Sequence, residues 1–170
     1  MAGLSVEIAN EFIRRAIADK HPLTQMQLQK LVYIAHGWNL AINGAPLTID
    51  SPQAWEYGPV YRELYSALSR YGRGPVVREV VNSETMLGAF DVGPEADKVA
   101  VADLTEAELA VITRVYRDYS KFHAYQLSAL THRENTPWTQ VYDRGNGKFE
   151  DIPDGLIKEH FVALAHNAAA

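Results

Sequence analysis

The sequence contains no cysteine, so it can form no disulfide, no thiolate metal site and no cysteine nucleophile. It also lacks a long apolar run. The most apolar stretch, residues 31–42, is shorter than the roughly 20 residues that a membrane-spanning helix needs. The first residues carry Glu7, Glu11 and Asp19 and show no apolar block of the kind found in signal peptides. These absences favour a cytoplasmic protein.

An excess of positive charge is missing as well. Sixteen basic and 21 acidic residues give a net charge of −5, and a chain of this sign is disfavoured as a nucleic-acid binder because it repels a polyanion. A local patch at Arg70, Arg73 and Arg78 keeps a DNA-binding regulator as one alternative function.

The length of 170 residues fits one domain, which can bury roughly 70% of its unfolded surface in a single core. Apolar residues recur at helical spacing along most of the chain, and residues 73–103 form the one long stretch without that spacing. We therefore predict a mainly α, compact single-domain bundle of about six to seven helices, with a small β-hairpin or irregular insertion near 73–103. The expected helices cover residues 5–20, 24–43, 59–71, 105–119, 122–130, a segment starting at 137, and 153–166.

Local signals mark where several of these helices begin. Thr24 and Gln27 form a capping-box pattern, and Thr105 and Glu108 form another. Pro59 is placed as if in the first turn of a helix, and this helix would stack Tyr61 over Tyr65 one turn later.

The side-chain patterns of catalysis and metal binding are weak in this sequence. Six histidines are present, but none occurs in a His-Glu-x-x-His arrangement, and neither a Gly-x-Ser-x-Gly elbow nor a phosphate-binding glycine loop is found. We therefore predict no catalytic residue, no metal and no cofactor. His36, inside an apolar run, is expected to be a hydrogen-bonded core residue. The alternative, a small hydrolase-type enzyme, would need His36, His132 and Glu134 to meet in one cleft.

Aromatic residues and arginines gather between positions 55 and 73. Tyr, Trp and Arg dominate the energetics of protein interfaces, being large, fairly rigid and amphipathic. This composition predicts a partner-binding surface, although individual rings could instead fill the core. The candidate residues are Trp55, Tyr57, Tyr61, Arg62, Tyr65, Arg70 and Arg73.

Four segments resemble one known family. They are residues 28–38 (LQKLVYIAHGW), 54–60 (AWEYGPV), 128–132 (SALTH) and 137–138 (PW), and together they resemble the phage-associated, GepA-like Panacea domain family. The resemblance implies a single Panacea-like antitoxin domain over residues 1–170, without catalysis, that neutralises a cognate protein toxin by direct binding.

For SocA-type antitoxins of this family, the resemblance further implies a proteolytic adaptor that delivers the toxin to the ClpXP protease. The alanine-rich end of the chain, residues 165–170, resembles the small apolar tags that the ClpX unfoldase reads. An ordinary frayed terminus is the simpler interpretation of the same residues.

Overall fold

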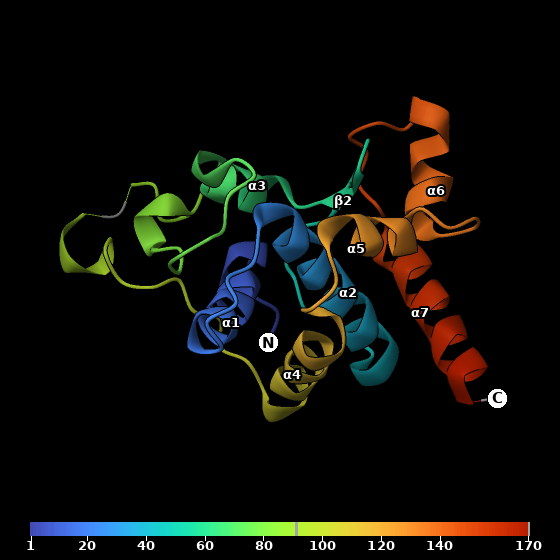
Figure 1. Cartoon of the computed structure of the whole chain (residues 1–170), viewed down its shortest axis with the longest axis horizontal. Helices are drawn as coiled ribbons and strands as arrows, with labels where there is room; N and C mark the ends of the chain where they lie inside the picture. The colour runs from blue at the N-terminus through green and yellow to red at the C-terminus, as the bar shows by residue number, and fades with distance from the viewer. Residues whose placement is uncertain (91, 170) are drawn as a thin grey trace.

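Helix α2 (Gln25–Asn43) lies at the centre of the computed structural model, which describes residues 1–90 and 92–169. It contacts five other helices and strand β2, and Figure 1 shows it in the middle of the molecule. The arrangement confirms the predicted mainly helical single domain. The other elements are α1 (Ser5–Ala18), β1 (Gln53–Trp55), β2 (Gly58–Val60), α3 (Arg62–Leu68), α4 (Glu106–Tyr119), α5 (Ala124–Thr131), α6 (Pro137–Tyr142) and α7 (Asp154–Ala169).

The ends of α2 form as the sequence predicts. The Gln27 amide N–H donates to Thr24 Oγ1 (3.3 Å), and the Thr24 N–H donates to Gln27 Oε1 (2.9 Å), which completes a capping box. The helix ends at Gly44, whose φ of 71° is left-handed and favours glycine. Neighbouring helices cover α2 on several sides, which explains why its sequence is apolar around most of its circumference.

Helix α7 docks closely on α2 because Gly37 has no side chain. A Cβ atom at Gly37 would lie 2.2 Å from the ring of Phe161. That ring meets Tyr33 and Trp38 edge to face, with centroid distances of 6.2 and 5.2 Å. A methyl group at position 37 would therefore block the aromatic contact between the two helices.

The segment between α3 and α4 is irregular, as predicted for residues 73–103. In Figure 1 it extends from the bundle on the side away from α7. It contains short 3₁₀ turns and an isolated bridge between Val81 and Val99, and a further bridge joins Pro75 to Thr24. The buried amide of Asn10 on α1 holds it in place by accepting a hydrogen bond from Val80 N (2.8 Å) and donating to the carbonyls of Val80 (2.9 Å) and Ala100 (2.8 Å).

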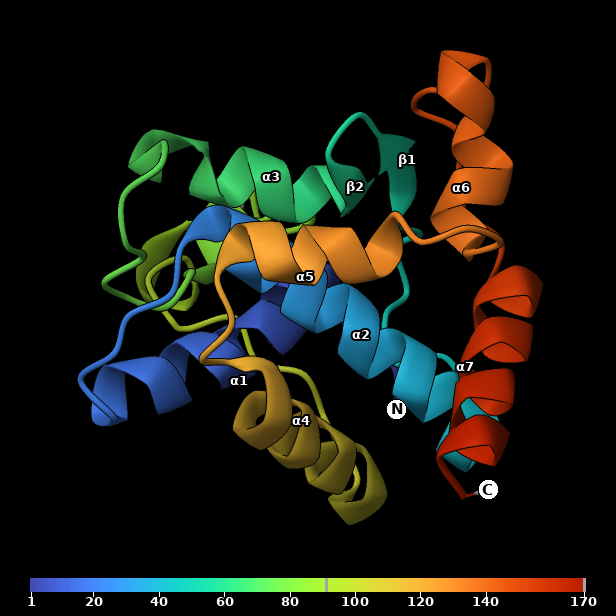
Figure 2. The same ribbon diagram turned by 45° about the vertical axis from the view of Figure 1, so that its right-hand side comes forward.

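The β-hairpin lies elsewhere than expected. Strands β1 and β2 pair antiparallel, with Gln53 opposite Val60 and Trp55 opposite Gly58, and Figure 2 shows them between α3 and α6. The prediction that a helix begins at Pro59 was therefore wrong. Gly58 has a φ of 110°, a conformation open mainly to glycine, and it returns the chain along β1 so that the helix starts only at Arg62.

Two further expectations need correction. Tyr61 is fully buried, and Thr48 Oγ1 donates a hydrogen bond to its hydroxyl (3.3 Å), so Tyr61 does not stack over Tyr65. The last helix continues past His166, because α7 extends to Ala169. Residues 165–169 of the alanine-rich tail are thus helical, and Ala170 lies outside the described residues.

Candidate functional site

The backbone of the hairpin is held by side chains that come from distant parts of the chain. The Gln29 side chain pairs with both backbone groups of Tyr61, since its Oε1 accepts from Tyr61 N (2.8 Å) and its Nε2 donates to Tyr61 O (3.1 Å). Next to it on α2, Lys30 Nζ donates to the carbonyl of Pro59 (2.9 Å). Helix α2 therefore fixes the second half of the hairpin through two buried polar side chains.

Helices α5 and α6 supply the donors for the turn and for β1. Ser128 Oγ donates to the carbonyl of Tyr57 (3.3 Å), and His132 Nε2 lies 3.3 Å from the carbonyl of Glu56. Trp138 Nε1 donates to the carbonyl of Trp55 (2.7 Å). All these donors and acceptors belong to the four segments singled out in the sequence, or lie one residue beyond them. The segments therefore form one hydrogen-bonded unit around the hairpin.

Lys30 is an unusual member of this unit because it is fully buried. Burial lowers the pKa of Lys30 to about 7, because removing the ammonium group from water disfavours its charged form. The chain passes very close to it at Gly58, where a Cβ atom would lie 2.9 Å from both Lys30 Cε and Thr131 Oγ1. Glycine is thus required at position 58 for two reasons, the positive φ of the backbone and the close approach of Lys30 and Thr131.

The outer face of the hairpin carries a group of aromatic rings. The Trp55 ring lies 5.0 Å from that of Tyr65 and 5.3 Å from that of Phe149, measured between centroids. Tyr57, at the tip of the turn, is 64% exposed, and Phe149 is 53% exposed. We call Trp55, Tyr57, Tyr65 and Phe149 the hairpin surface.

Phe149 was not among the candidates predicted from the sequence. It reaches Trp55 because residues 149–151 run along β1, with Phe149 N donating to Ala54 O (2.7 Å) and Ala54 N donating to Glu150 O (2.8 Å). The only local signal was an aromatic residue directly after the Gly145–Lys148 turn. That signal does not indicate which distant residue the ring will contact.

The other predicted interface residues fall into two groups. Arg62 is exposed at the start of α3, beside the hairpin, whereas Tyr61 is buried in the core and cannot touch a partner in this conformation. Arg70 and Arg73 are exposed at the far end of α3, and Arg70 pairs with Glu84 of the irregular segment. The structure therefore brings the rings of Trp55, Tyr65 and Phe149 together, with Tyr57 exposed at the tip of the same turn, while Arg70 and Arg73 follow the end of α3.

The cluster of His36, His132 and Glu134 that the hydrolase alternative requires is not formed. His36 is a core residue whose Nδ1 accepts from the backbone N–H groups of Leu47 and Thr48, both at 3.2 Å, so its Nε2 donates to Asp154 (2.9 Å). The His132 ring instead lies between the carbonyl groups of Ser128 (2.6 Å from Nδ1) and Glu56 (3.3 Å from Nε2), and Glu134 is exposed. The three side chains share no partner among residues 1–90 and 92–169, and no cluster of His, Asp and Glu able to hold a metal occurs in that part of the chain.

The arginine patch considered for DNA binding is partly neutralised. Arg70 and Arg78 both pair with Glu84, and the hydrogen bond from Arg78 is the main cause that lowers the pKa of Glu84 to about 2. A carboxylate held between two arginines reduces their attraction for phosphate groups. No helix of the described residues is long and apolar enough to cross a membrane.

Comparison with known proteins identifies the family of this chain. The family model described as "Antitoxin SocA-like, Panacea domain" matches residues 28–139, a range that contains Gln29, Lys30, Ser128, His132 and Trp138. A relative described as "Antitoxin SocA", from Caulobacter vibrioides (strain NA1000 / CB15N), is 31% identical over 161 residues, which cover 91% of this chain and 80% of the relative. No solved structure gave a significant match.

Proposed function

The chain belongs to the SocA-like antitoxin family with a Panacea domain. We propose that it neutralises a cognate protein toxin by direct binding through the hairpin surface. The observation that carries the proposal is the contrast between the two faces of the hairpin. Its backbone is fixed by buried and half-buried side chains of α2, α5 and α6, while Tyr57, Tyr65 and Phe149 are exposed on the outside.

A fixed backbone favours binding for an energetic reason. Ordering a flexible loop at an interface costs about 0.5–1.5 kcal/mol for each immobilised side chain, and a preformed loop avoids much of this cost. The hydrogen bonds from Gln29, Lys30 and Trp138 leave the hairpin few alternative conformations. The backbone that carries Trp55 and Tyr57 is therefore ordered before the toxin arrives.

The composition of the surface also suits a protein partner. Three aromatic rings, those of Trp55, Tyr65 and Phe149, lie against one another, and the charged residues Glu56, Arg62 and Lys148 are exposed next to surface residues in the chain. An apolar, aromatic centre with a charged rim is the usual anatomy of a protein interface. Lys148 lies 5.1 Å from the centroid of Phe149, where its charge contacts the face of the ring.

The test uses the protein encoded by the adjacent gene as the candidate toxin. The two proteins are co-expressed, complex formation is measured by pull-down, and rescue is measured as cell growth. The variant Tyr57→Ala/Tyr65→Ala should weaken the complex by roughly 100-fold or more, because interface aromatics often contribute at least 2 kcal/mol each. Growth rescue should be lost together with binding.

Tyr125→Ala is the matched control. Tyr125 is 88% exposed on α5 and lies outside the hairpin surface, so its removal deletes an exposed tyrosine of the same size. We expect wild-type binding for this variant. Equal loss in both variants, or wild-type binding by the hairpin variant, would assign the toxin to another face.

We propose as a second step that the bound toxin is delivered to ClpXP, as the family resemblance implies. The direct measurement is the half-life of the toxin in cells with and without this protein, and with and without ClpX. Delivery predicts that the toxin half-life falls only when both are present. A toxin that is neutralised but equally long-lived in all four strains would leave a simple binder and rule out the adaptor step.

A further inference from the structure

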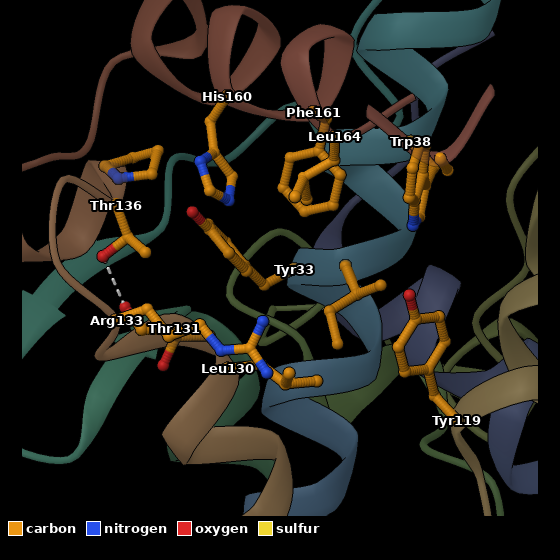
Figure 3. Close-up of a pocket in the computed structure, with 13 residues that line it drawn as sticks. Tyr33, Trp38, Tyr119, Leu130, Thr131, Arg133, Thr136, His160, Phe161 and Leu164 are labelled. Carbon is orange, nitrogen blue, oxygen red and sulfur yellow. Dashed lines mark hydrogen bonds between the residues drawn. The ribbon is translucent and has the colours of Figure 1, made fainter. Parts of the chain in front are cut away.

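A second site lies between α2, α5 and α7. Figure 3 shows a cleft there, with a volume of about 270 Å³, lined by thirteen residues. Its floor is apolar and is formed mainly by Trp38, Leu130, Phe161 and Leu164. The volume is slightly below the roughly 300–1,000 Å³ of typical ligand pockets, so it fits one large side chain and its backbone better than a nucleotide.

Three polar side chains, those of Tyr33, Arg133 and His160, line this cleft. The Tyr33 side chain is buried, and Figure 3 shows its hydroxyl pointing toward the ring of His160. That hydroxyl makes no hydrogen bond with another protein group among residues 1–90 and 92–169, and it keeps some exposure to solvent, because it is not one of the fully shielded unpartnered atoms there. Arg133 is exposed at the rim, and its guanidinium is directed over the cleft near Leu130.

The position of Arg133 is well defined by its backbone. Its carbonyl accepts hydrogen bonds from Thr136 N (3.3 Å) and Thr139 Oγ1 (2.8 Å), which fix the α5–α6 connection. The thirteen lining residues include Arg133 and His160 but no aspartate or glutamate. The positive charge at the cleft therefore lacks a carboxylate among the lining residues, and an anionic ligand would supply one.

We propose that this cleft binds the C-terminal residue of a polypeptide, with its apolar side chain against Phe161 and its carboxylate at Arg133 and the Tyr33 hydroxyl. A C-terminal residue carries a carboxylate on the same Cα as an apolar side chain, which matches a cleft where polar groups border an apolar floor. An aspartate or glutamate side chain offers the carboxylate but leaves the apolar floor uncovered.

This proposal does not depend on toxin binding at the hairpin surface. The probe is a synthetic peptide of sequence Gly-Ser-Ala-Phe, prepared once with a free carboxylate and once as the carboxamide. The sequence has three tryptophans, so binding can be followed by the three indole N–H signals in a ¹H–¹⁵N spectrum. Trp38 lines the cleft whereas Trp55 and Trp138 do not.

We expect the free-acid peptide to shift the Trp38 signal alone and to bind about tenfold more tightly than the amide, because a charged hydrogen bond contributes about 1.5–3 kcal/mol. Arg133→Gln should abolish this preference, and Arg144→Gln, an exposed arginine outside the cleft, should preserve it. Tyr33→Phe should also weaken binding of the acid while leaving stability nearly unchanged, since the hydroxyl it removes makes no hydrogen bond with another residue of the described chain.

Three results would overturn the proposal. They are the absence of a Trp38 shift at millimolar peptide, equal affinity of the acid and the amide for the wild type, and an unchanged preference in Arg133→Gln. Phenylacetate serves as a further probe. If it binds as tightly as the free-acid peptide, the cleft is a site for a free aromatic acid and the assignment to a polypeptide end is wrong.

Discussion

The indole nitrogen of Trp138 donates a hydrogen bond of 2.7 Å to the carbonyl oxygen of Trp55. The Trp138 ring also stacks on Tyr142, with centroids 4.6 Å apart, and lies 3.8 Å from the ring of His132. One side chain thus links the end of α5, the length of α6 and the first strand of the hairpin. Its size fills the space between them, and its single donor fixes the strand.

Trp138→Phe should separate these two roles, because phenylalanine keeps an aromatic ring and loses the donor. We expect a loss of about 1–2 kcal/mol in the free energy of unfolding and faster amide hydrogen exchange in residues 53–60. Tyr142→Leu, which removes the stacking partner and leaves the indole donor in place, is the comparison. Slow hydrogen exchange at the hairpin in Trp138→Phe would show that the indole hydrogen bond does not hold the strand.

Gly37→Ala should destabilise the contact between α2 and α7. Alanine is a better helix former than glycine by about 1 kcal/mol, but its Cβ would lie 2.2 Å from Phe161. Overpacking of this kind costs about 1–3 kcal/mol, so we expect a net loss measured by urea unfolding. Phe161→Leu should offset part of it in the double variant.

Gly155→Ala is the control for this experiment, since no atom lies within 4 Å of a Cβ placed at that position in α7. It should leave stability unchanged or raise it. If both alanine variants behave alike, the close approach of α7 to α2 is not the reason for glycine at position 37.

Lys30→Met should alter how stability depends on pH. The pKa of Lys30 is lowered to about 7 from an ordinary value of 10.5, so between these limits the unfolded chain binds a proton at Lys30 that the folded chain does not. The stability of the wild type relative to the variant should therefore rise with pH through this window, by up to about 1.4 kcal/mol per pH unit, and stay constant below it.

Urea midpoints between about pH 6 and about pH 9.5 provide the measurement for Lys30→Met. Lys121→Met, which removes an exposed lysine, is the matched control and should track the wild type across the range. Parallel profiles for wild type and Lys30→Met would mean that Lys30 stays charged in the folded protein.

Glu84→Gln should weaken the irregular segment between α3 and α4. The hydrogen bond from Arg78 and the contact with Arg70 hold the pKa of Glu84 at about 2, below its ordinary 4.5. This stabilisation is present above pH 4.5 and is lost as the pH falls toward 2.

At neutral pH we expect Glu84→Gln to lose about 1 kcal/mol, a value reduced for solvent because both arginines are about half exposed. The difference from wild type, measured by thermal unfolding, should vanish near pH 2. Glu95→Gln, in an exposed pair with Lys98, should have little effect at any pH. A difference for Glu84→Gln that persists in acid would point to a cause other than charge.

The sequence predicted those parts of the fold that depend on neighbouring residues. Thr24 with Gln27 and Thr105 with Glu108 form the capping boxes that their spacing indicates. Pro137 begins α6 one residue after its cap, Thr136. A cap is made within four residues, so the residues that form it also appear together in the sequence.

The errors arose where distant residues decide the conformation. Gly58 and Pro59 read locally as a helix start, but pairing with Gln53–Trp55 makes them a strand. The hairpin surface shows the same limit. Trp55, Tyr57 and Tyr65 are close in sequence and were proposed together as candidates, whereas Phe149 packs on Trp55 from a separate segment. Tyr61 could not be assigned to the core without knowing that Thr48 accompanies it there.

The spread of the hairpin's hydrogen-bond donors along the chain has a consequence for synthesis on the ribosome. Residues 53–60 emerge well before Trp138 and Phe149, which bind the backbone of Trp55 and Ala54. Until those later residues follow, water must satisfy the carbonyl groups that they will bind. A copy terminated before Trp138 would contain the hairpin residues but lack the hydrogen bonds to the carbonyl groups of Trp55 and Ala54, so the complete turn can form only after residue 149 has been translated.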